Sequence, residues 1–93
     1  MSEYRIFETD EFRKSLTKLD SREAEYLRKK LRSHVYAQLR QMPFFGPNIK
    51  KLQGYDPETW RYRIGRFRVF YLVQEKDRIV FLLTVDRRKD AYR

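Results

Sequence analysis

The spacing of apolar residues predicts two helices in the first half of the chain. The first helix follows Thr9, whose hydroxyl can cap it, and its apolar residues recur at helical spacing: Phe12, Leu16 and Leu19. Asp20 and Glu23 have the spacing of a capping box and precede a second helix of about twenty residues. Its apolar stripe repeats every three or four residues up to Pro43, which ends the helix: Leu27, Leu31, Val35, Leu39 and Met42.

Shorter apolar runs predict four strands, one before the helices and three after them. The strands are Tyr4 to Glu8, Thr59 to Ile64, Phe67 to Gln74 and Arg78 to Val85. The last is almost continuously apolar, which favours a strand covered on both faces. Residues 44–59 are rich in proline and glycine and are predicted to form a loop. The order β-α-α-β-β-β predicts an α+β fold, with two helices packed on one face of a small, mainly antiparallel sheet.

Arginines occupy one face of the strands on either side of Gly65. Alternation puts Arg61 and Arg63 on one face, while the apolar residues of the two strands build the core: Trp60, Tyr62, Ile64, Phe67 and Val69. If Gly65-Arg66 forms a two-residue type II′ turn, Arg63 lies directly opposite Arg68. Like charges in that position destabilise a strand pair. A bound anion such as a phosphate would relieve the repulsion.

Composition indicates a single domain with an anionic partner. The 93 residues, spanning 1–93, are 41% hydrophobic and carry a net charge of +9. Such a charge attracts nucleic acid, an acidic protein or an anionic membrane surface. The chain has no cysteine and one histidine, His34, which falls beside the helical stripe, so we expect neither a metal site nor a cofactor. No signal peptide or membrane-spanning run is evident, and we expect a cytoplasmic protein that does not bind membranes.

A second basic cluster follows the last predicted strand and adds to the arginine face. It contains Arg87, Arg88, Lys89 and Tyr92. Arginine binds phosphate oxygens with two parallel hydrogen bonds and stacks on bases, so RNA or single-stranded nucleic acid is the natural ligand. The simpler alternative is a solvated basic face whose arginine stems cover apolar surface. Lys50 and Lys51 are weaker evidence, because a lysine pair in a loop usually serves solvation.

Three segments in order resemble the RelE/ParE superfamily of toxins from toxin-antitoxin modules. They are KKLQG at 50–54, WRYRIGRFRVFY at 60–71 and DRRKDAYR at 86–93. The resemblance implies a microbial ribonuclease-like fold and a metal-independent endoribonuclease, an mRNA interferase that cleaves mRNA in the ribosomal A site and inhibits translation. It also implies three kinds of partner: the ribosome, mRNA and an acidic cognate antitoxin.

The resemblance also implies roles for individual residues. It matches Arg68, Arg88, Tyr92, Arg63 and Arg61 to catalytic positions, and the flanking cations are expected to hold nucleic acid: Lys50, Lys51, Arg66 and Arg87. RNA cleavage by its own 2′-hydroxyl needs charge stabilisation on the phosphate and groups that move protons. Arginine cannot accept a proton, and some relatives have lysine at Arg61 and Arg63 or histidine at Arg87. The nearby carboxylates are Asp56, Glu58 and Asp86, and the sequence selects none of them as the base.

Two other functions remain open on the same fold. One is a ParE-like inhibitor of DNA gyrase, since ParE-like members share much of the arginine hairpin pattern. The other is a catalytically weak relative that binds RNA without cleaving it. Under every alternative we expect an acidic, largely disordered antitoxin segment that folds over this basic chain.

Overall fold

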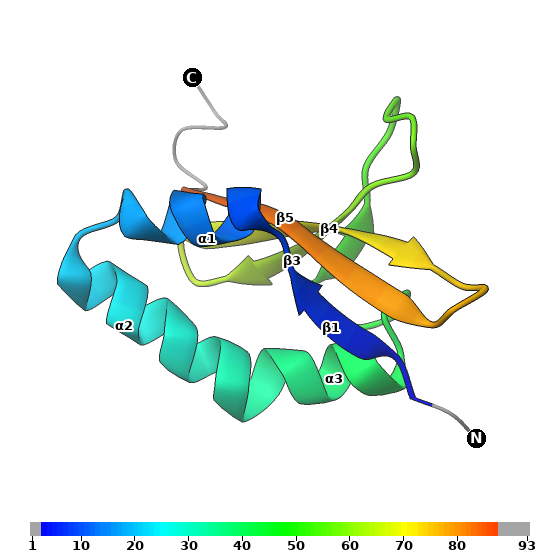
Figure 1. Ribbon diagram of the computed structural model, residues 1–93, viewed down its shortest axis with the longest axis horizontal. Helices are drawn as coiled ribbons and strands as arrows, with labels where there is room; N and C mark the ends of the chain where they lie inside the picture. The colour runs from blue at the N-terminus through cyan, green and yellow to red at the C-terminus, as the bar shows by residue number, and fades with distance from the viewer. Residues whose placement is uncertain (1–2, 88–93) are drawn as a thin grey trace.

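The computed structural model describes residues 3–87 and has the predicted α+β architecture. Helices cover one face of a mixed sheet with strand order β1-β5-β4-β3-β2, in which β1 runs parallel to β5 and the other pairs are antiparallel. Figure 1 shows α2 and α3 forming one long helix along this face. The elements are β1 (Arg5–Glu8), α1 (Asp10–Thr17), α2 (Ser21–Lys30), the π-helical turn η1 (Leu31–Val35), α3 (Tyr36–Gln41), β2 (Ile49–Lys51), β3 (Trp60–Ile64), β4 (Phe67–Gln74) and β5 (Ile79–Arg87).

Both predicted helix caps are confirmed. The Thr9 hydroxyl accepts a hydrogen bond from the Phe12 N–H at 3.1 Å, and the Asp20 carboxylate accepts one from the Glu23 N–H at 2.9 Å. In a full capping box the Glu23 side chain would turn back to the Asp20 N–H. Here the Glu23 carboxylate accepts a hydrogen bond from Arg87 instead, at 2.6 Å, which ties α2 to the end of β5. None of the helices within residues 3–87 is long and apolar enough to cross a membrane.

A π-helical turn keeps the long helix in register with the core. In an α-helix, residues spaced by four drift around the axis by about 40° at each step. The i→i+5 hydrogen bonds of a π turn widen the helix and so take up part of that drift. Four stripe residues therefore stay buried: Leu27, Leu31, Val35 and Leu39. The prediction for Met42 is wrong: this residue caps the helix in an extended conformation and is 44% exposed.

The β3–β4 hairpin has the predicted register. Ile64 pairs with Phe67 and Arg63 pairs with Arg68. Gly65 has a φ of 58°, whereas Arg66 is not among the residues with positive φ, and this combination fits a type II′ turn rather than type I′. Gly65 has a second reason to be glycine, because a Cβ there would lie 3.1 Å from the Tyr26 hydroxyl oxygen.

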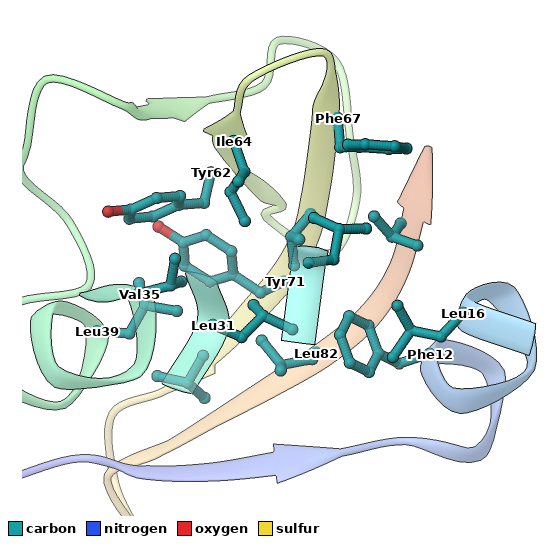
Figure 2. Close-up of a cluster of buried hydrophobic side chains, with 14 of the residues drawn as sticks. Phe12, Leu16, Leu31, Val35, Leu39, Tyr62, Ile64, Phe67, Tyr71 and Leu82 are labelled. Carbon is teal, nitrogen blue, oxygen red and sulfur yellow. The ribbon is translucent and has the colours of Figure 1, made fainter. Parts of the chain in front are cut away.

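The core lies between the helices and one face of the sheet (Figure 2). Four of the five predicted hairpin residues are buried in it, and the fifth, Trp60, is half-buried and packs against it. The prediction that β5 is covered on both faces is wrong. Val80 and Leu82 are buried, whereas Phe81 and Leu83 are only half-buried, because the helices cover one face and leave the other open.

The sequence predicted a loop between the helices and the hairpin, but part of this segment forms a strand. Ile49–Lys51 forms the edge strand β2, in which Ile49 pairs with Tyr62 and Lys50 pairs with Arg61. This strand is short and has one apolar residue, so the period-2 signal is too weak to reveal it. Its consequence is functional, because it fixes two lysines beside the arginines of β3.

Tyr71 should contribute measurably to stability through its hydroxyl. The side chain is fully buried and donates a hydrogen bond to the Pro43 carbonyl oxygen at 2.7 Å. Tyr71→Phe leaves that carbonyl unpaired, and we expect a loss of about 1–3 kcal/mol in the free energy of unfolding measured by urea titration. Tyr55→Phe at an exposed position is the control and should change it by less than about 0.5 kcal/mol. Equal effects in the two variants would contradict the assignment.

Candidate nucleic-acid interface

A pocket lined by five cations lies on the open face of the sheet. Its volume is about 250 Å³, and its charged residues come from three neighbouring strands: Lys50, Lys51, Arg61, Arg63 and Arg68. We call this the cationic pocket. The pairing of β2 with β3 and of β3 with β4 builds it. Such a concentration of positive charge fits a phosphate or another anion.

Arg68 is the residue of this pocket whose environment most favours the binding of an anion. Its Nε is buried and has no hydrogen-bond partner within residues 3–87. Its guanidinium lies over the Phe70 ring, with the carbon 5.0 Å from the ring centroid. A buried donor without a partner costs about 1–3 kcal/mol, so such groups are rare in native proteins. An anion could accept hydrogen bonds from the guanidinium while the Phe70 ring supports it.

The other cations of the pocket are held to different degrees. The Arg61 guanidinium donates a hydrogen bond to the Asn48 carbonyl oxygen at 2.9 Å, which fixes its direction. Arg63 is exposed and faces Arg68 across the strand pair. Lys51 forms an ion pair with Glu58 at 2.8 Å, and this hydrogen bond holds the pKa of Glu58 below its usual value. Lys51 is therefore already partly neutralised, whereas Arg63 is presented to solvent.

The structure distinguishes the three carboxylates that the sequence left as alternatives. Glu58 is ion-paired with Lys51. Asp56 lies exposed before β3, outside the strands that build the pocket. Asp86 is the partner of Arg68 in the register of β4 with β5, so the two side chains share the open face. Asp86 is therefore the carboxylate that the sheet brings beside Arg68 on the open face.

Not every predicted binding residue is brought to this pocket. Arg87 lies on the helix side, where it donates a hydrogen bond to Glu23. Arg66 is in the hairpin turn and lines a separate pocket with Arg22. Arg88 and Tyr92 lie outside the described residues. Phe70 was not among the residues predicted for the site, although its position two residues after Arg68, on the same strand face, was the available signal.

Comparisons with known proteins agree with the fold and with the resemblance found in the sequence. The family model described as the ParE toxin of the type II toxin-antitoxin system parDE matches residues 6–92. The candidate toxin RelE1 of Methanocaldococcus jannaschii is 48% identical over 46 residues, which is 50% of this chain and 50% of that protein. That match thus spans half the length of the curated relative.

Solved structures extend the similarity over nearly the whole chain. The toxin-antitoxin complex RelBE2 from Mycobacterium tuberculosis contains a chain with a TM-score of 0.71 and 25% identity, covering 95% of this chain and 94% of that one. The intact RelBE toxin-antitoxin complex of E. coli contains one with a TM-score of 0.62 and 26% identity, covering 90% and 95%. With the family match across residues 6–92, these similarities show that the chain belongs to the RelE/ParE superfamily and is a toxin of type II toxin-antitoxin systems.

Proposed function

We propose that this toxin is a ribosome-dependent endoribonuclease that cleaves mRNA in the A site and so inhibits translation. The observation that supports it best is the cationic pocket around Arg68, whose buried Nε has no partner within the described residues. A phosphodiester would bring negative charge and hydrogen-bond acceptors to the cations of this pocket. The similarity to RelE proteins favours RNA as the source of that phosphate.

The pocket suits stabilisation of charge better than it suits proton transfer. In this proposal Arg63 and Arg68, which pair across the hairpin, hold the phosphoryl oxygens while the 2′-hydroxyl attacks, the step in which negative charge builds up. Arg61 adds a third guanidinium, whose direction is fixed by its hydrogen bond to the Asn48 carbonyl oxygen. None of these three arginines can accept a proton at neutral pH. Asp86 is the carboxylate next to Arg68 on the same face of the sheet. By the resemblance, Arg88 supports the leaving group and Tyr92 stacks on a base or moves a proton.

Cleavage on ribosomes tests this proposal directly. Programmed ribosomes incubated with the purified toxin should give 3′ mRNA ends within the A-site codon, mapped by primer extension. The same mRNA without ribosomes should remain intact, because the ribosome supplies the positioning that a site with a weak base needs. Intact mRNA in both samples would contradict the proposed activity.

Inhibition of DNA gyrase is a second candidate function. The specific observation in its favour is that the matching family model is that of the ParE toxin, although the structural neighbours are RelE toxins. Cells expressing the toxin should then accumulate double-strand breaks while their mRNA stays intact. Cleaved mRNA with intact chromosomes supports the endoribonuclease instead.

We propose that an acidic antitoxin binds and neutralises the toxin, and we expect both proteins in the cytoplasm. The structural neighbours include toxins solved in complex with RelB antitoxins. The chain carries a charge of +9, and the open face of its sheet shows apolar rings, with Phe7 53% exposed and its ring 5.6 Å from that of Phe81. An acidic segment with apolar anchors would cover both features at once.

A further inference from the structure

A second cationic surface runs along the long helix, outside the cationic pocket. A cavity of about 350 Å³ lies between the start of α2 and the hairpin turn, and its walls include Arg22 and Arg66. A cavity of about 270 Å³ lies further along the helix, beside Lys30 and Arg63. Both cavities are lined by Tyr26 and Gly65, so they adjoin each other. Together they form a groove between the helix and the β3–β4 hairpin, which we call the Tyr26 groove.

Tyr26 offers an aromatic surface in the middle of this groove. Tyr26 is 43% exposed, and its ring packs against the Phe67 ring with a centroid separation of 6.5 Å. The Lys30 Nζ lies 6.0 Å from the Tyr26 ring centroid. The absence of a side chain at Gly65 leaves room for the Tyr26 hydroxyl. Tyr26 is thus a supported ring that keeps much of its surface in solvent.

The charges around the groove are almost all positive. Arg22, Lys30, Arg63 and Arg66 line it, on both the helix wall and the hairpin wall. Glu23 is the acid among the lining residues, and its carboxylate is neutralised by Arg87 at 2.6 Å. A positively charged track with an aromatic platform is the usual construction of a site for single-stranded nucleic acid.

The Tyr26 groove is continuous with the cationic pocket through one residue. Arg63 lines both the pocket and the groove. The pairing of β2 with β3 ends at Tyr62, and the Arg63 N–H makes one further hydrogen bond to the Asn48 carbonyl oxygen at 2.9 Å, so Arg63 lies at the end of this pairing. A chain whose phosphate lies in the pocket can therefore pass Arg63 and continue along the helix side of the hairpin.

We propose that the Tyr26 groove binds single-stranded RNA on one side of the phosphate held in the cationic pocket, with a base stacked on Tyr26. This inference rests on the proposed endoribonuclease function, because it uses the pocket as the phosphate site. RNA fits better than an acidic peptide for two reasons. The groove continues into a site for a phosphate, and its exposed ring offers a flat face between cations rather than a closed apolar hole for an anchoring side chain.

The test compares RNAs of two lengths that cannot be cleaved. A dinucleotide and an octanucleotide, both 2′-O-methylated, are titrated into the isolated toxin and into Tyr26→Leu, with binding followed by fluorescence anisotropy. Loss of one stacked base should weaken octanucleotide binding by about 5-fold to 100-fold. The dinucleotide, which occupies the cationic pocket, should bind both proteins equally. Tyr26→Phe keeps the ring and should bind the octanucleotide within about 3-fold of the parent.

Tyr55→Leu is the matched control, because Tyr55 is also an exposed tyrosine but lies outside the groove. It should leave the affinity for both RNAs unchanged. Equal octanucleotide affinity in Tyr26→Leu and the parent overturns the proposal, as does an equal loss for both RNA lengths. A Tyr26→Leu variant that loses antitoxin affinity but not RNA affinity shows instead that the groove is a protein interface. This test measures RNA binding and no cleavage. If the cleavage assay on ribosomes fails, the binding result can therefore still be interpreted on its own.

Discussion

Arg68→Ala is expected to lower mRNA cleavage on ribosomes by about 100- to 1,000-fold, which is the usual cost of losing one donor that stabilises transition-state charge. The cause is specific to this side chain, because its guanidinium lies over Phe70 and its buried Nε lacks a partner within residues 3–87. Arg68→Lys keeps the charge but loses the planar pair of donors, so we expect a partial loss of about 10-fold or more. Rates of A-site cleavage under single-turnover conditions measure both effects.

Arg5→Ala is the control for this prediction. Arg5 is an exposed arginine on β1, at the opposite edge of the same sheet from β2 and β3. Its removal lowers the net charge by the same amount but should change the cleavage rate by less than about 3-fold. Equal losses in Arg5→Ala and Arg68→Ala would mean that only overall charge matters, and the assignment of the cationic pocket would be wrong.

Phe12→Ala should destabilise the fold by about 3–5 kcal/mol, the range for removing a buried aromatic ring. Phe12 has no exposed surface and joins α1 to the core that the sheet shares with the long helix, as Figure 2 shows. The loss comes from the transfer free energy of the ring and from the cavity that it leaves. Urea unfolding followed by circular dichroism measures the change.

Phe7→Ala provides the comparison within the same residue type. Phe7 is 53% exposed on the open face and meets Phe81 only edge to face. We expect a cost of about 1 kcal/mol or less. A loss for Phe7→Ala as large as that for Phe12→Ala would show that the open face contributes as much stability as the core, which the burial pattern contradicts.

The sequence predicted the parts of the fold that depend on local periodicity and turn chemistry. Thr9 and Asp20 were predicted as helix caps, and Gly65 fixed the register that sets Arg63 opposite Arg68. These predictions succeeded because the hydrogen bonds of a cap or a two-residue turn join residues that are close along the chain.

Features that depend on tertiary packing were not predictable in the same way. The strand β2 has little apolar pattern and exists because its backbone pairs with β3. Continuous apolar residues in β5 indicated burial on both faces, but only one layer of helices is present to cover it. Arg87 was assigned to RNA by its charge, whereas its partner Glu23 lies 64 residues earlier in the chain. Such pairings follow from the folded topology and leave no local signal.

The π turn at η1 has a consequence for how this chain can change. Because the turn holds one more residue than an α-helical turn, converting residues 31–35 to regular α-helix without deleting a residue would change the phase of the helix. The change would rotate everything after it by about 100°, the angle of one α-helical residue. Leu39 would then leave the core, and Gln38 would lose its hydrogen bond with the Tyr62 hydroxyl. Among related sequences, we therefore expect a relative that is one residue shorter in this segment to have a regular α-helix here, with the residue that corresponds to Leu39 still facing the core.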